Sequence, residues 1–245
     1  MSNNYSAPES ALVTAEASGG SLEAGIAGDY EFKVFDVLGE AWEKTKGVKR
    51  YILGGGIAIY VGLYVAITVA FVIATIGSGG GNPPSGAGML IAFLLIAAVM
   101  IAMLPLGCGL FTMALKHIQG QKAEFGDLFT CFNKTASLVI AAILMNLMIM
   151  VGMFLFLLPG IYLSFAYFLA IPLIVDRGMG PWEAMEASRK ALTKRWFSVV
   201  GFYIMIMLII FVSSIPLGIG LIWTMPMTVL AMAILYRQVF GIVSY

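Results

Sequence analysis

Charge is scarce in this sequence, and its scarcity excludes most classes of protein at once. Lys and Arg number 14 and Asp and Glu number 13, in a chain of 245 residues of which 60% are hydrophobic. A soluble domain of this size needs a charged shell around its core, and these residues are too few to supply one. The near balance of basic and acidic residues also gives no reason to expect a nucleic-acid partner.

Histidine and cysteine are equally rare, which excludes the common catalytic and metal-binding sites. His117 is the single histidine, and neither Cys108 nor Cys131 has a second cysteine at CxxC spacing. We therefore predict no metal site, no disulfide framework and no cofactor. No nucleophile or orienting carboxylate stands at a recognised spacing from His117, so we do not expect an enzyme.

The chain contains three long stretches without any charge. They run from Tyr51 to Leu115, from Ala136 to Val175 and from Trp196 to Tyr236. Each stretch has room for two spans, because one span needs about 20 apolar residues. This pattern predicts an all-α membrane protein with six transmembrane helices arranged as three hairpins. The predicted helices are Tyr51–Ile76, Met89–Leu115, Ala136–Leu158, Gly160–Val175, Phe197–Ile215 and Gly218–Tyr236.

The loops between these helices are of two kinds. The loops at 77–88, at Pro159-Gly160 and near Pro216 carry no charge, and every Lys and Arg falls in the other set. The positive-inside rule places the basic set in the cytoplasm, with both termini on that side of a bacterial inner membrane. A four-span alternative would scatter the basic blocks over both faces, so six spans are favoured.

A short segment of similar pattern precedes each predicted hairpin. The segments are Phe35–Ala41, Phe125–Cys131 and Trp182–Ser188, each with an aromatic residue three positions before Leu or Met. This spacing puts the two side chains on one helix face and predicts three cytoplasmic amphipathic helices in the membrane interface. Residues 30–245 then form one transmembrane domain. The polar composition of residues 1–29 predicts a disordered cytoplasmic tail.

The third of these segments has the clearest helix signals. Pro181 suits a first turn, and Glu186 and Lys190 form an i, i+4 pair. Its aromatic and basic residues are candidate contacts with anionic lipid or with a protein partner, and a plain structural anchor is the alternative. These residues are Trp182, Arg189, Lys190, Lys194, Arg195 and Trp196.

Small residues and one amide are the candidate helix-packing positions. Gly54, Ala58 and Gly62 recur every four residues along the first helix, a spacing that lets two backbones approach closely. Packing within the bundle is the first interpretation, and a seam between two copies of the chain is the second. Asn146 is the most polar side chain deep in a span, and it predicts an interhelical hydrogen bond or, alternatively, a substrate contact.

The predicted spans hold no Asp, Glu, Lys, Arg or His. Proton pumps and ion-coupled carriers place such groups at mid-membrane, so their absence argues against proton coupling. Pro105, Pro172 and Pro226 each lie in the second helix of a predicted hairpin, where each frees a backbone carbonyl. Helices kinked in this way could frame a path for a neutral or apolar solute.

The stretch from Leu158 to Trp196 resembles a known pattern. It combines a Pro-Gly turn, an apolar helix, a Val-Asp pair followed by glycine, and an Ala/Ser-rich helix with basic residues. The positions concerned are Pro159, Gly160, Val175, Asp176, Gly178, Ala184, Ala187, Ser188 and Lys190. The pattern resembles a broad group of uncharacterised bacterial six-helix membrane proteins, which is similar to the membrane domain fused to some glycerophosphodiester phosphodiesterases. The resemblance implies the six-helix fold, and it implies no hydrolysis because the catalytic domain has no counterpart here.

Two functional hypotheses follow from these patterns. The first is a non-enzymatic integral inner-membrane protein that organises lipid or serves as an accessory subunit of a membrane complex. The second is a carrier or channel for a neutral or apolar solute without proton coupling, motivated by the three prolines. Membrane lipids are the expected partners, and a protein partner or a second copy of the chain stays open.

Overall fold

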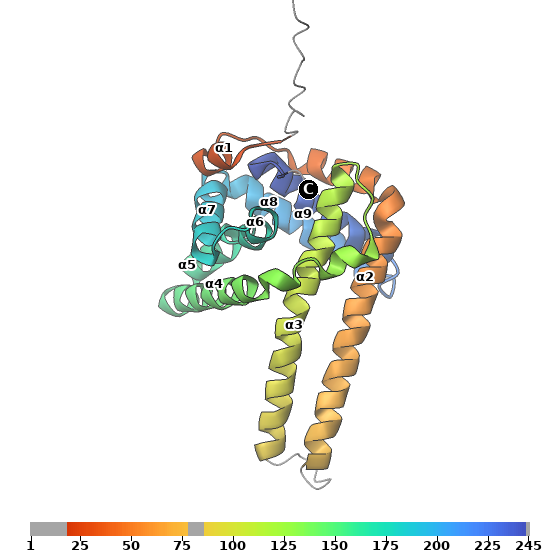
Figure 1. Ribbon diagram of the computed structural model, residues 1–245. Coiled ribbons are helices and arrows are strands. Elements are labelled where there is room, and N and C mark those ends of the chain that lie inside the picture. Colours follow the sequence, from red (N-terminus) through yellow and green to blue (C-terminus); the bar gives the residue numbers. More distant parts are fainter. Residues whose placement is uncertain (1–18, 78–85, 244–245) are drawn as a thin grey trace, which may run out of the picture.

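The computed structural model describes residues 19–77 and 86–243, and this part of the chain is helical without a strand (Figure 1). The α-helices are α1 Leu22–Ala27, α2 Val34–Gly77, α3 Gly86–Ile118, α4 Thr135–Leu155, α5 Leu157–Ala166, α6 Ala170–Arg177, α7 Pro181–Lys194, α8 Trp196–Ser214 and α9 Leu221–Phe240. Two 3₁₀ turns, η1 Phe125–Phe129 and η2 Phe132–Lys134, precede α4. The predicted all-α class is confirmed.

Five segments are long and apolar enough to cross a membrane, so the chain is a multi-pass helical membrane protein. They are Val34–Ile76, Gly86–Ile118, Phe125–Leu155, Leu157–Arg177 and Trp196–Ser214. The predicted sixth span, α9, is not among them. Its sequence carries two threonines, with Arg237 and Gln238 in its last turn, and most of its side chains are buried against other helices.

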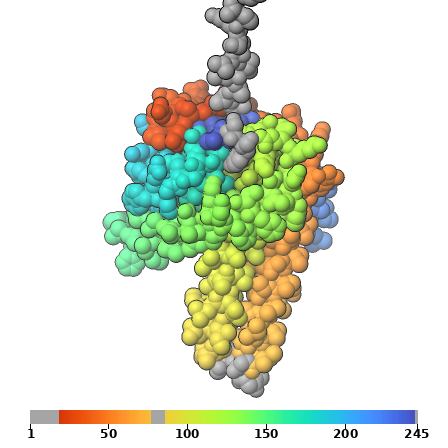
Figure 2. Space-filling model, viewed as in Figure 1, coloured from red at the N-terminus to blue at the C-terminus, as the bar shows by residue number. Residues whose placement is uncertain are grey.

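The two longest helices extend away from the rest of the molecule. α2 and α3 run side by side, and their far ends project as a prong, defined here as residues 57–77 and 86–101 (Figures 1 and 2). Ala70 and Ala74 are buried between the two helices, whereas Tyr60, Phe71 and Phe93 are exposed. A surface of this kind is stable only against lipid or another apolar partner.

The remaining helices form a body at one end of the prong (Figure 1). Figure 1 shows α4 lying across the direction of α2 and α3. α9 packs along the bend of α2: Arg237 pairs with Glu40 at 2.8 Å, and the Lys49 ammonium lies 4.0 Å from the centre of the Trp223 ring. The turn before α9 therefore lies near the basic end of the first span, not on the opposite face as the alternating loops predicted.

α2 is two helices joined at a bend. Lys46 (φ −67°, ψ 122°) and Gly47 (φ 101°, ψ −33°) leave helical geometry. Gly47 lies in the left-handed region that glycine adopts without a steric cost, so it places the bend. The residues before it cover the predicted first interfacial segment: Val37, Leu38 and Ala41 are buried there.

The two later interfacial segments differ from each other. The segment expected to form a second amphipathic helix, Phe125–Cys131, forms the 3₁₀ turn η1 instead, so that prediction is wrong in its helix type. Asp127 is buried in this turn and pairs with Lys116 of α3, which ties the turn to α3. The third segment is the regular helix α7.

The predicted helix Gly160–Val175 is broken after Ala166. α5 ends there and α6 begins at Ala170, which places Pro172 in the first turn of α6, where its missing N–H needs no partner. Ser188 of α7 is fully buried beside the break: its hydroxyl donates to the Ala166 carbonyl (2.7 Å) and accepts from the Leu169 N–H (3.1 Å). Pro105 and Pro226 lie inside continuous helices.

The N-terminal segment requires a correction. Residues 19–29 belong to the tail predicted to be disordered, yet they form α1 and pack on α7 and α9. The Gly20 N–H donates to the Arg237 carbonyl at 3.0 Å, and the Tyr30 hydroxyl donates to the Ala191 carbonyl at 3.0 Å. Burial raises the pKa of Tyr30 to about 12. Residues 1–18 of the predicted tail lie outside the described residues.

Candidate functional site

The basic residues predicted on α7 are mostly paired. Glu186 receives two hydrogen bonds from Arg189, at 2.7 and 2.8 Å, and lies 3.4 Å from the Lys190 ammonium. The Arg189 hydrogen bonds hold the pKa of Glu186 at about 2, well below its usual value. The same hydrogen bonds raise the pKa of Arg189. Glu186 therefore offsets one of the two positive charges within this turn of α7 and weakens its attraction for a distant anion.

The other α7 candidates are also engaged in contacts within the molecule. Arg195 lies 3.5 Å from Glu31, and Gly28 lies against the aliphatic stem of Lys194. The Trp196 ring packs on Tyr162 and Phe165, with centroids 5.2 and 5.4 Å away. Trp182 is 60% exposed. The α7 cluster, defined as Arg189, Lys190, Lys194 and Arg195, is thus largely part of the body.

Of the predicted helix-packing residues, only Gly62 faces another helix at contact distance. A Cβ built on Gly54 meets nothing within 4 Å, and one on Gly62 meets only the end of Met103 at 3.9 Å. Ala58 is exposed. Asn146 is exposed too, and its amide donates to the Ala142 carbonyl of its own helix at 2.8 Å instead of bridging two helices.

The close approach of α2 to its neighbours uses Gly55 instead. A Cβ on Gly55 would lie 2.7 Å from Leu110 and 3.1 Å from Leu128. Gly55 is next in sequence to the predicted stripe, so this close approach uses a neighbouring face of the helix, and a seam between two copies along the stripe stays a prediction.

The bend of α2 brings together basic residues that lack acidic partners. The Nε2–H of His117 donates to the Lys44 carbonyl at 2.8 Å, a carbonyl that the bend releases from the helix, so His117 has a structural role. Lys46 and Lys122 are exposed, and among the described residues no carboxylate lies within ion-pair distance of either.

Two neighbours extend this group. Lys49 contacts the Trp223 ring, and Arg50 donates to the Tyr51 hydroxyl at 2.7 Å. Both contacts are with neutral side chains, and although Glu124 lines the same hollow as Arg50 and Lys122, no ion pair joins it to either of them. We call Lys46, Lys49, Arg50 and Lys122 the kink cluster.

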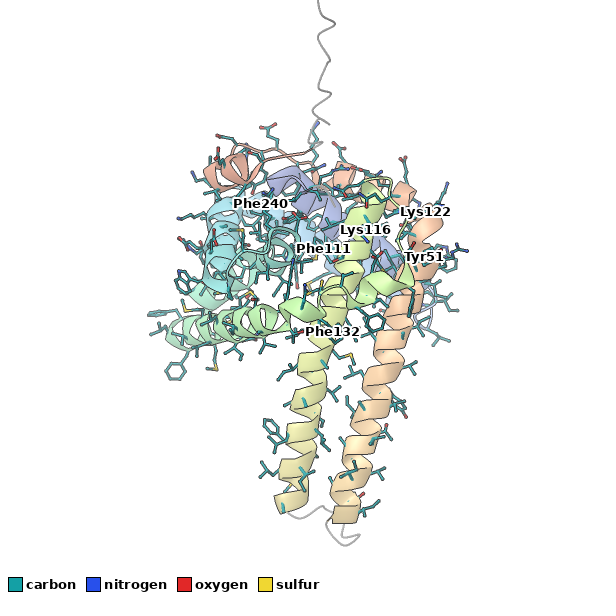
Figure 3. The ribbon with its side chains drawn as sticks, in the orientation of Figure 1. Tyr51, Phe111, Lys116, Lys122, Phe132 and Phe240 are labelled. Carbon is teal, nitrogen blue, oxygen red and sulfur yellow. The ribbon has the colours of Figure 1, made fainter. Side chains whose placement is uncertain are left out.

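Two hollows flank the kink cluster. One, of about 500 Å³, is lined by Arg50, Tyr51, His117 and Lys122 among others. The other, of about 320 Å³, is lined by Trp42, Thr45, Lys46, Gly47, Lys49 and Trp223. Figure 3 shows Tyr51 and Lys122 on the same side of the molecule, beside α2. Amphipathic Trp rings and free ammonium groups are the side chains that favour a membrane–water interface.

A buried polar network joins the ends of three helices and was not predicted. Asp176 accepts a hydrogen bond from the Tyr236 hydroxyl (2.7 Å) and another from the Val243 N–H (3.3 Å). Arg177 donates to the Phe240 carbonyl, and Arg237 binds Glu40. Asp176 and Tyr236 are 60 positions apart, so sequence spacing gives no signal for the pair. The network fixes α6, α9 and α2 relative to one another.

The remaining candidates give no chemical site within residues 19–77 and 86–243. There, no group of three or more His, Cys, Asp or Glu side chains is placed to hold a metal ion. Pro105, Pro172 and Pro226 are buried, and none of them lines either hollow beside the kink cluster.

Comparisons with known proteins add no further assignment. The chain matches no protein-family model, no curated protein and no solved structure. The resemblance to the membrane domain of certain phosphodiesterases therefore stays an expectation, and any function must be argued from the geometry of this chain alone.

Proposed function

We propose that this protein is a non-enzymatic inner-membrane protein that gathers anionic phospholipid around the bend of α2. The observation that carries the proposal is the contrast in pairing: the kink cluster lacks carboxylate partners, whereas Arg189 and Lys190 share Glu186. Free basic residues at a membrane surface attract anionic headgroups, each contributing roughly 1 kcal/mol. The sequence pattern predicted the lipid contacts on α7, whereas this proposal places them at the bend of α2.

The position of the cluster along α2 supports this role. The bend separates a helix that packs on the body from the apolar helix that continues into the prong. Trp42 and Trp223 border the same hollow as Lys46 and Lys49. Basic and aromatic residues at the start of a long apolar helix correspond to the headgroup level of a bilayer.

The orientation in the membrane is part of the proposal. The basic face lies in the cytoplasm of a bacterial cell, in accord with the positive-inside rule. The contact of Gly20 with Arg237 supports a topology in which both ends of the chain lie on the same side.

The test is a double substitution, Lys46→Gln with Lys49→Gln. The wild type, reconstituted in phosphatidylcholine vesicles with one fifth phosphatidylglycerol and then extracted gently, should retain phosphatidylglycerol preferentially, as measured by lipid mass spectrometry. Loss of two charges, about 2 kcal/mol in total, should lower that preference roughly thirtyfold.

The matched control is Lys190→Gln, which removes an equally accessible lysine that is paired with Glu186. The control should keep the preference of the wild type. Equal preference in the wild type and the double variant would overturn the proposal, because the kink cluster would then have no part in lipid selection.

A further inference from the structure

An apolar groove begins one helical turn beyond the kink cluster. Its volume is about 290 Å³, and no charged side chain lines it. α2, α3 and α9 each contribute to its walls. The lining residues are Ile52, Leu53, Gly56, Ile57, Tyr60, Leu110, Met225 and Val229.

The groove and the kink cluster share one face of α2. Lys49, Leu53, Gly56 and Tyr60 follow at intervals of three and four residues, which is the spacing of one helix face. The rise from Lys49 to Leu53 is about one turn, or 5.4 Å. α9 borders both hollows, with Trp223 beside Lys49 and Val229 beside the groove. Positive charge therefore adjoins an apolar channel on the same surface.

Gly56 makes room for an occupant. A Cβ built on Gly56 meets nothing within 4 Å, although the residue lines the groove. The adjacent Gly55 differs, since its built Cβ would press on Leu110 and Leu128. Gly55 serves helix packing, and Gly56 leaves open space beside the groove.

We infer that this surface holds one anionic phospholipid per chain, with its phosphate at Lys46 and Lys49 and one acyl chain in the α2–α9 groove. The inference rests on the proposed function and adds to it a defined site with a stoichiometry. Charge complementarity selects the headgroup, and the apolar lining selects a hydrocarbon chain over a free anion.

The test fills the groove by the substitution Gly56→Leu, and Gly54→Leu is the matched control. Both changes put the same side chain into the same turn of α2, so both gain equally in helix propensity. A Cβ on Gly54 also meets open space, but Gly54 lines neither the groove nor the hollows beside the kink cluster. Size-exclusion chromatography and thermal unfolding verify that each variant folds.

The measurement is the molar ratio of phosphatidylglycerol to protein after extraction from the vesicles used above. The wild type and Gly54→Leu should retain about one lipid per chain, and Gly56→Leu should lose at least nine tenths of it. Inorganic phosphate in large excess should not displace the lipid. Displacement by phosphate would overturn the inference in favour of a free-anion site.

The variants separate failure of the inference from failure of the proposed function. Full retention by Gly56→Leu, with loss in Lys46→Gln/Lys49→Gln, would overturn the groove and leave charge selection intact. Full retention by both variants would overturn the groove and the proposed function together.

Discussion

The α7 cluster and the kink cluster have the same kinds of residue but differ in how far their basic side chains are paired with carboxylates. Each holds Lys and Arg near aromatic side chains at the edge of the body. In the α7 cluster, Arg189 and Lys190 share Glu186, and Arg195 lies near Glu31. In the kink cluster the contacts are with Trp223 and Tyr51, which carry no charge.

The comparison shows that what matters for lipid binding is free charge rather than the number of basic residues. An ion pair on an exposed helix adds little stability, but it cancels the field that a distant headgroup would feel. Glu186 offsets one of the two charges of Arg189 and Lys190, because it lies three and four positions before them on the same helix face. In the kink cluster, Glu43 lies three positions before Lys46, but the two form no ion pair, and Lys46 and Gly47 leave helical geometry at this point.

The largest effect is expected from Ser188→Ala, which tests whether α7 is a structural part of the body. The substitution leaves the Ala166 carbonyl and the Leu169 N–H buried without the Ser188 hydroxyl. Each buried unpaired group costs about 1–3 kcal/mol, so the free energy of unfolding should fall by about 2–4 kcal/mol. Thermal unfolding in mild detergent measures the loss. A change below 0.5 kcal/mol, roughly the level of a neutral surface substitution, would show that the break in the helix does not depend on α7.

The next effect concerns the bend itself. Gly47→Ala forces a side chain into a left-handed conformation, although the nearest other atom is 3.8 Å from its Cβ. The cost is conformational, about 1–3 kcal/mol, and it should lower both stability and phosphatidylglycerol retention. Gly39→Ala is the control, because Gly39 lies in a helix with open space around its Cβ. Retention that survives Gly47→Ala would separate the lipid site from the geometry of the bend.

The smallest effect should come from removing the carboxylate that pairs with the basic residues of α7. Glu186→Gln releases Arg189 and Lys190 from their shared partner. Stability should change by less than about 1 kcal/mol, and the preference for phosphatidylglycerol should rise about two- to fivefold. Lipid mass spectrometry measures this gain. If the preference stays constant, pairing is not what keeps lipid from α7.

Lowering the pH also breaks these ion pairs, because it protonates the Glu186 carboxylate. The pKa of Glu186 lies at about 2 in the folded protein, below its usual value of 4.5. The stabilisation from its ion pairs is therefore complete above pH 4.5, and it is lost as the pH falls toward 2. Glu186→Gln should remove the contribution of this residue to acid sensitivity in that window.

Local properties of the chain predicted most of the helices. A long run of apolar residues is enough to define a span, so α3, α4 and α8 begin and end close to the predicted residues. The break between α5 and α6 was not predicted, and Pro172 alone could not have predicted it, because Pro105 and Pro226 lie inside continuous helices. The Phe125–Cys131 segment failed because a 3₁₀ turn and an α-helix share the same short spacing of apolar residues.

The site could not be predicted in the same way. The kink cluster depends on the non-helical backbone conformation of Gly47. A glycine in a helical pattern does not by itself predict a bend. The free charge of Lys46 and Lys122 depends on which carboxylates lie nearby in space. Ser188 acts on backbone atoms 19 and 22 positions away. Each of these depends on contacts between distant segments.

The hydrogen bond between Gly20 and Arg237 also sets the parity of the membrane crossings. Two residues in contact lie on one side of a membrane, so the chain between them crosses it an even number of times. Five helices have the length and composition of a span, and five is odd. α9 does not supply a sixth crossing, because Trp223 at its start lies beside Lys49 and Arg237 near its end pairs with Glu40, so the five cannot all cross. A single contact at the edge of the body thus constrains how the whole chain is threaded through the bilayer.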